Sequence, residues 1–250
     1  MVARVWRPAT LSLLQRAGIQ PGMACLDVGC GGGDVSLDLA RLVEPGGRVV
    51  AMDFDEVKIA IARDEARAQN IVNVEFRVAD IDDCGISAEF DLAYARFILT
   101  HLHSPARALV KMREAIRPGG VIVVADTDLR GLFWEPDNPG LRRYVELYTE
   151  TLKRRGGDAN IGPRLPGLLT CSGFENVQIS VAQWAATSGD MKLLIPITME
   201  NIADAVIAEG LATRAEADKL VAQLYEFAND PNTVLSGPRV IETWGYRPAA

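Results

Sequence analysis

A chain of 250 residues, 48% of them apolar, is long enough to fold around one large core as a single globular domain. The net charge of −7 and the pI near 5.0 disfavour nucleic acid as a partner, because phosphate backbones bind basic surfaces. No stretch approaches the roughly 18 uninterrupted apolar residues of a membrane span, and the first residues lack a secretion signal, so we expect a cytoplasmic protein that binds small molecules.

Up to about residue 128, apolar runs alternate with helical patterns, which is the rhythm of a parallel α/β sheet. The predicted strands cover residues 24–28, 48–53, 74–78, 90–95 and 121–126. Four of them are rich in Val, Ile or Leu, as strands buried on both faces are. The predicted helices cover residues 34–41, 56–69 and 105–116, and a short helix within residues 8–16 precedes the first strand.

The helix at residues 105–116 has explicit start and stop signals. Ser104 is its expected cap, Pro105 takes the first helical position, and the residues RPGG close it. Beyond residue 128 the texture changes to polar and aromatic helices, predicted at residues 138–155 and 191–229. Further strands are predicted at residues 177–184 and 240–246.

The cysteine and histidine content predicts no metal site. Four cysteines are scattered along the chain, Cys25, Cys30, Cys84 and Cys171. They form no C-x-x-C pair, and a chain of this size is stable without crosslinks, so reduced thiols are expected. The histidines, His101 and His103, do not stand at a familiar zinc-ligand spacing.

The stretch CLDVGCGGGDVSLDLA places a glycine run between a predicted strand and a predicted helix. A dinucleotide site wants G-x-G-x-x-G; Gly29 and Gly31 fit, but the third place falls on Asp34. A phosphate-binding P-loop fails because no Gly-Lys-Ser or Gly-Lys-Thr follows. What remains is an acid-x-G-x-G-x-G pattern that runs from Asp27 to Gly33. Its glycines let the backbone approach a ligand and adopt positive φ, while the carboxylate can orient the loop.

This loop resembles that of the class I S-adenosylmethionine-dependent methyltransferases, in which it bends beneath the methionine part of the cofactor. Asp53 ends the second predicted strand, where a carboxylate can accept bonds from both ribose hydroxyls, although a dehydrogenase shares this feature. Asp80 follows the third strand, where the family uses an acid for the adenine amino group, with the Ile81 backbone beside it. The segment FDLAYARFILTHLHSPARALVKMREAIRPGGVIVVAD resembles the family's fourth strand, helix and fifth strand, in a form typical of quinone-biosynthesis and other small-molecule methyltransferases.

The resemblance covers about residues 20–128 and implies a Rossmann-like, doubly wound sheet of seven mostly parallel strands, the last antiparallel. It implies S-adenosyl-L-methionine as cofactor and a small organic molecule as methyl acceptor. We expect one domain over residues 1–250, with a cofactor-binding core at 1–128 and helical lid insertions at 129–176 and 186–232. We expect these insertions or a second subunit to close the site, so a homodimer is one of the two possibilities.

The residues predicted to bind the cofactor are Asp27, Gly29, Cys30, Gly31, Asp53, Phe54, Asp80, Ile81 and Arg96. Cys30 lies within the loop, where its thiol fills space, and Phe54 either stacks on adenine or packs in the core. Arg96 comes just past the fourth strand, where a guanidinium binds the cofactor carboxylate or an anionic substrate, or else forms a surface salt bridge. Asp55 and Asp82 are neighbours that could replace the predicted acids.

The predicted catalytic residues are His101 and Asp126. The imidazole pKa suits a general base for a phenol or hydroxyl acceptor, although the His101–Leu102 pair can serve packing instead. Asp126, at the end of the fifth strand, either binds or deprotonates substrate or makes loop hydrogen bonds. Tyr144 and Tyr148 form either a packed helix face or the wall of an acceptor pocket.

Two other functions remain open from the sequence. The same pocket could serve a cofactor-binding protein with a non-methylating or regulatory role. An NAD-dependent oxidoreductase is less favoured, because Asp34 replaces the third dinucleotide glycine and Asp80 has no role there.

Overall fold

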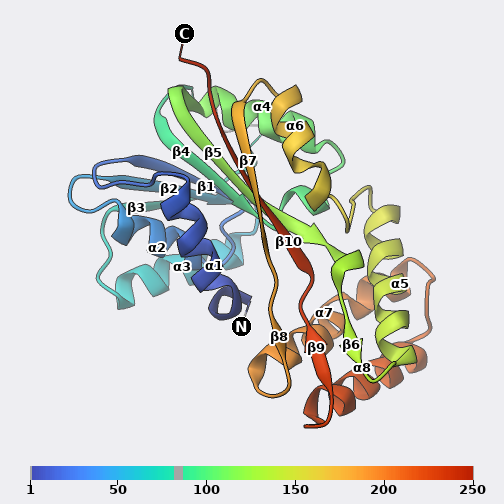
Figure 1. The fold of residues 1–250 in the computed structure, drawn as a ribbon. Coiled ribbons are helices and arrows are strands. Elements are labelled where there is room, and N and C mark those ends of the chain that lie inside the picture. Colours follow the sequence, from blue (N-terminus) through green and yellow to red (C-terminus); the bar gives the residue numbers. More distant parts are fainter. Residues whose placement is uncertain (1, 82–86, 250) are drawn as a thin grey trace.

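A computed structural model of the chain describes residues 2–81 and 87–249. A central sheet carries helices on both faces, and a smaller group of helices and short strands lies beyond one end of it (Figure 1). Asp82 and Cys84, which the sequence analysis names, lie outside the described residues. Within the described part, no helix combines the length and apolar character needed to cross a membrane.

The central sheet has seven strands in the order β3-β2-β1-β4-β5-β10-β7. They are β1 (Ala24–Val28), β2 (Arg48–Asp53), β3 (Val74–Val78), β4 (Phe90–Arg96), β5 (Ile116–Asp128), β7 (Glu175–Ala182) and β10 (Arg239–Tyr246). β10 pairs antiparallel with β5 and β7, whereas β1 to β5 pair in parallel. The predicted fold class, a doubly wound and mostly parallel sheet, is confirmed.

Helices cover the two faces of the sheet separately (Figure 1). One face carries α1 (Val2–Arg16), α2 (Asp34–Leu42) and α3 (Glu56–Ala68), and the other carries α4 (Pro105–Ala115) and α6 (Leu165–Cys171). The start of α3 follows from its sequence, because the Asp55 carboxylate accepts bonds from the N–H groups of Val57 and Lys58 at 3.0 and 3.2 Å. Alternating residues of each central strand pack against the two helical layers, which explains why β1 is buried along its whole length.

The remaining elements form a second, smaller core, called the helical lobe from here on. They are β6 (Trp134–Glu135), α5 (Pro139–Arg154), β8 (Ala185–Ala186), α7 (Leu194–Ala208), α8 (Arg214–Asn229) and β9 (Val234–Ser236). The short strands pair in the order β6-β9-β8, and Leu141, Met199 and Leu224 are among the side chains buried between the three helices. The chain enters the lobe after β5, goes back to the sheet through α6 and β7, enters the lobe again at β8, and returns from it into β10 (Figure 1).

The structure corrects several predicted elements. The single helix predicted at residues 191–229 is wrong: the chain turns at Gly210, where φ is +67°, and Thr213 begins α8 with a reciprocal capping box to Glu216. Helix α1 starts at Val2 rather than within residues 8–16, and Pro8 lies inside it. The small sheet and α6 were not predicted, and α6 packs against the core beside α4 although it lies within the segment predicted as an insertion.

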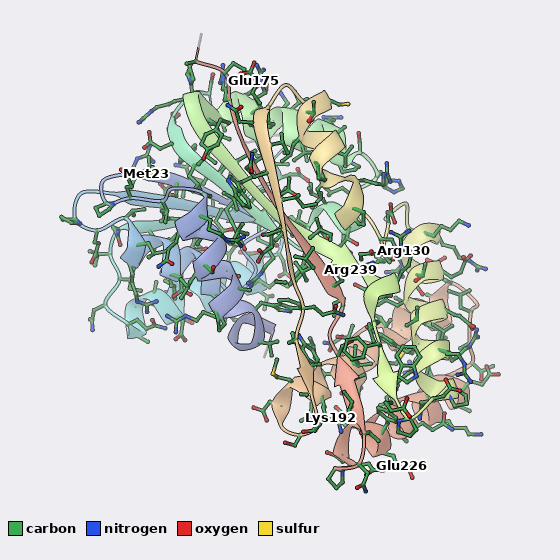
Figure 2. The ribbon with its side chains drawn as sticks, viewed as in Figure 1. Met23, Arg130, Glu175, Lys192, Glu226 and Arg239 are labelled. Carbon is green, nitrogen blue, oxygen red and sulfur yellow. The ribbon has the colours of Figure 1, made fainter. Side chains whose placement is uncertain are left out.

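Lys192, just before α7, is a fully buried cation in the helical lobe (Figure 2). Its Nζ donates to the carbonyl oxygens of Thr187, Asp230 and Thr233 at 3.2, 2.7 and 3.1 Å, and to the Thr233 hydroxyl at 2.6 Å. One side chain therefore joins the segment before α7 to the turn after α8. Burial lowers the pKa of the ammonium group.

Lys192→Met should lower the free energy of unfolding by roughly 1–3 kcal/mol, because the substitution leaves buried carbonyl oxygens without a donor. Urea unfolding measures the change. Lys219→Met, an exposed lysine of α8, is the matched control and should change stability little. Equal stability of the two variants would contradict a structural role for the buried ammonium.

Candidate active site

A cavity of about 580 Å³ lies at the carboxyl ends of β1 to β4, beneath α5 and α7. The ends of β1, β2 and β3, with α3, contribute Val28, Gly29, Met52, Asp53, Phe54, Lys58, Ala79, Asp80 and Ile81. The segment after β4 contributes Phe97, Ile98, His101 and Leu102. The helical lobe contributes residues of α5 and α7 and the residue directly after α5, which are Tyr148, Thr151, Leu152, Arg155, Thr198, Ile202 and Ala205. The cavity is therefore shared by the sheet and the lobe.

The glycine loop after β1 forms one edge of the cavity. Gly29 and Gly31 have φ values of +71° and +53°, a region that side chains disfavour. A Cβ on Gly29 would stand 2.1 Å from Ile98 Cδ1, so the position also has no room for a side chain. The Gly31 N–H donates to Asp53 Oδ2 at 2.9 Å, which ties the loop to the end of β2.

Asp27 precedes the loop and Cys30 lies within it, and neither lines the cavity. The buried Asp27 carboxyl accepts the Ser36 hydroxyl at 2.6 Å and thus holds α2 to β1, and burial raises its pKa to about 6. Burial also raises the pKa of the Cys30 thiol above its usual range, and its side chain packs on the cluster that contains Phe76. Their cofactor roles stay predictions, and the contacts present here are with the protein.

The residues predicted to surround a nucleoside do come together. Asp53, Phe54, Asp80 and Ile81 line one end of the cavity, at the ends of β2 and β3. The Asp53 carboxylate also accepts the Asp55 N–H at 3.0 Å, so its position is set by two backbone donors. Phe54 is 78% exposed, which leaves its ring face uncovered beside the two acids.

Arg96 faces away from this cavity. Its guanidinium donates to the Thr10 hydroxyl at 2.8 Å and lines a separate hollow of about 250 Å³ with residues of α1 and α2. In the same hollow, Arg7 makes a two-bond ion pair with Asp38, with both distances 2.8 Å. The structure thus places Arg96 among α1 contacts, and its predicted role with a ligand is untested.

Phe97 is a cavity residue that the sequence reasoning missed. Its φ is +57°, unusual for a residue with a side chain, and its N–H donates to the Ala125 carbonyl at 3.0 Å. The ring meets Trp6 of α1 edge-on, with centroids 5.8 Å apart. Such backbone conformations concentrate at functional sites, but the residue types around Phe97 give no signal of it.

The predicted catalytic pair occupies two different environments. His101 lines the cavity, and burial, with a smaller contribution from the Lys58 charge, lowers the pKa of its imidazole. Asp126 is buried and does not line the cavity; its carboxyl oxygens accept the N–H groups of Thr100 at 3.0 Å and Thr127 at 2.8 Å. Burial raises the pKa of Asp126 to about 7. The geometry makes Asp126 a support of the short helix Leu99–His101, and its predicted catalytic role stays a prediction.

Asp128 is also turned away from the cavity. Its buried carboxylate accepts bonds from Arg130 at 2.7 Å and Arg239 at 2.5 Å. Figure 2 shows the two arginines where β5 and β10 meet the helical lobe. Asp128 therefore joins the end of β5 to the start of β10. In the described residues, no three His, Cys, Asp or Glu side chains gather in a way that could hold a metal ion.

Comparison with known proteins places the chain in a family. Residues 19–151 match a family model described as a methyltransferase domain. Among curated proteins, the chain is 29% identical over 148 residues to the ubiquinone/menaquinone biosynthesis C-methyltransferase UbiE of Ectopseudomonas mendocina, with 58% of this chain and 54% of that protein covered. The chain spans little more than half the length of this relative.

Two solved structures share the fold over nearly the whole chain. Phosphoethanolamine N-methyltransferase 2 of Haemonchus contortus, solved with phosphomonomethylethanolamine and S-adenosylhomocysteine, is 17% identical with a TM-score of 0.62 and covers 96% of this chain and 52% of its own. The [4+2]-cyclase SpnF is 22% identical with a TM-score of 0.59 and covers 97% and 82%. At these identities the likeness concerns the fold.

Replacing Asp126 should change how stability depends on pH. Because the folded pKa of about 7 lies above the unfolded value of about 3.9, the folded state binds the extra proton, and stability falls as pH rises between these values. Asp126→Asn removes that proton exchange, so the advantage of wild type over the variant should shrink from about pH 5 to about pH 8. Urea unfolding at both pH values gives the difference. A difference independent of pH would contradict the raised pKa.

Proposed function

The chain belongs to the methyltransferase domain family, and from this we propose that it is an S-adenosylmethionine-dependent methyltransferase whose acceptor is a small organic molecule. The observation that carries the proposal is the shared cavity. At one end, the glycine loop, Asp53 and Asp80 stand where the family's cofactor residues are expected, and the other end is a mostly apolar wall from two helices.

The side chains at the first end fit a nucleoside sulfonium cofactor. Asp53 can accept the ribose hydroxyls, Asp80 and the Ile81 backbone can pair with adenine, and the exposed Phe54 ring offers a stacking face. The glycine loop leaves backbone free to contact the methionine part. S-adenosyl-L-methionine supplies a methyl group already activated on sulfur, so the protein mainly positions the acceptor and excludes water.

His101 is the residue we assign to proton removal. A lowered pKa keeps its imidazole neutral near pH 7, so a ring nitrogen can accept a proton from a hydroxyl acceptor. Asp126 acts through this residue as a positioning group, because it accepts the Thr100 N–H and so fixes the short helix that carries His101. We also propose that α5 and α7 serve as the lid of the site.

The second candidate is a cofactor-binding protein that does not transfer methyl groups. The similarity of the fold to a cyclase supports keeping it, because one fold hosts several activities. The family assignment favours a methyltransferase over the NAD-dependent oxidoreductase that the sequence had left open. A cytoplasmic location, the absence of nucleic acid from its partners and a homodimer stay predictions.

Phe54→Ala should weaken binding of S-adenosylhomocysteine about tenfold or more while leaving stability unchanged, because the ring is exposed and its stacking on adenine is lost. Calorimetry measures the affinity. Val57→Ala is the matched control, an apolar α3 residue that is 69% exposed and does not line the cavity. If both variants bind as wild type does, the adenine is not held at this end.

Methyl transfer itself is tested with cofactor labelled in the methyl group and a metabolite extract. We expect label in a small molecule, and calorimetry should show binding of S-adenosylhomocysteine and none of NAD. Tight binding of S-adenosylhomocysteine without labelled product across many acceptors would favour the non-methylating candidate. Tight NAD binding alone would overturn the cofactor assignment.

A further inference from the structure

The lobe side of the cavity has a polarity different from the cofactor side. Asp53 and Asp80 are the acidic residues among the described cavity residues, and both belong to the strand ends. The wall built by α5, α7 and the segment after β4 is apolar apart from hydroxyl groups, His101 and Arg155. A cationic acceptor would find no carboxylate on this wall.

Thr151 of α5 has an unusual hydroxyl. The residue is 5% exposed, and its Oγ1 has no hydrogen-bond partner among the described residues. Two other helical threonines donate their hydroxyls to the preceding turn, Thr198 to the Leu194 carbonyl at 2.7 Å and Thr170 to the Pro166 carbonyl at 3.0 Å. A buried hydroxyl without a partner lowers the stability of the fold, and a ligand atom in the cavity can supply the missing hydrogen bond.

Tyr148 stands one turn before Thr151, on the same face of α5. Burial, with a smaller effect of the Asp126 charge, raises the pKa of its phenol to about 12, so the group stays protonated and can donate. The two side chains thus place two hydroxyl groups beside the apolar residues of this wall, which suits an acceptor that presents an oxygen there.

Cationic groups stand on two sides of the same cavity. Lys58 of α3 has its Nζ 3.8 Å from Asp55, and the Arg155 Nε donates to Glu209 at 3.2 Å. Both cations are about half exposed, and pairs of this kind contribute only about 0–1 kcal/mol, so a ligand anion can compete for them. Burial and, to a smaller extent, the Lys58 charge lower the pKa of His101, which favours the uncharged imidazole beside these two cations.

We propose that the acceptor is an apolar molecule with an anionic oxygen group, bound through the hydroxyls of Tyr148 and Thr151 with Lys58 or Arg155 as its cationic partner. This specifies the substrate class and rests on the proposed function. We expect ammonium compounds to bind more weakly, because the cavity residues of α5 and α7 include hydroxyl groups and a cation and no carboxylate.

The test uses three probes of one shape, 2-naphthoate, 2-naphthol and 2-naphthylmethylammonium, added to protein saturated with S-adenosylhomocysteine. Calorimetry should show 2-naphthoate binding about tenfold more tightly than the ammonium probe and more tightly than 2-naphthol. Thr151→Val and Tyr148→Phe should each weaken 2-naphthoate about tenfold, because each removes a donor to a charged oxygen.

Thr170→Val is the control, because its hydroxyl belongs to α6 and is exposed outside the cavity. Affinity for S-adenosylhomocysteine is measured first in each variant and should equal wild type. Stronger binding of either other probe, no binding of 2-naphthoate, or wild-type affinity for 2-naphthoate in both α5 variants overturns the inference while leaving the cofactor site intact. Failure of S-adenosylhomocysteine to bind wild type would instead overturn the proposed function.

Discussion

The reversal of strand order between β1 and β4 is the constraint on which the site depends. From β1 the chain builds outward through β2 and β3, and it then returns to place β4 on the other side of β1. The connections after β1 and β4 therefore leave the sheet in opposite directions, and a crevice opens between them. Gly29, after β1, and Ile98, after β4, pack together at this edge and both line the cavity, so the cavity follows from the topology.

Polar groups at the strand ends give this crevice a defined shape. Asp53 holds the glycine loop through the Gly31 N–H and at the same time faces the cavity, so one carboxylate serves both the loop and the predicted nucleoside. Asp27, on the neighbouring strand β1, is buried, and its carboxyl accepts the hydrogen bond of the Ser36 hydroxyl. Two acids near the carboxyl ends of neighbouring strands thus have different roles, because only Asp53 lines the cavity.

Thr100 connects the sheet and the helical lobe to the segment that carries His101. Its N–H donates to Asp126 in β5, its hydroxyl donates to the Asp158 carbonyl, and its carbonyl accepts the Asp158 N–H. The last two distances are both 2.9 Å. Since Asp158 follows the end of α5, the position of this helix is coupled to that of the imidazole. The two halves of the cavity therefore share one hydrogen-bonded support.

Strands β1, β2 and β3 were predictable from sequence to the residue. β1 and β2 are short apolar runs that end at a glycine or an acid, and β3, at the edge of the sheet, alternates apolar and charged residues. The same logic placed Gly29, Asp53 and Asp80 together, since the carboxyl ends of parallel strands share one edge. The prediction of one helix at 191–229 was wrong because it passed over local stop and start signals, Gly210 and the capping box of Thr213 with Glu216, which separate α7 from α8. The local sequence pattern determined which residues stand at the strand ends where the cofactor is expected. Only tertiary packing decided which residues of α5 and α7 cover them, because contacts between elements far apart in the chain produce no regular residue spacing.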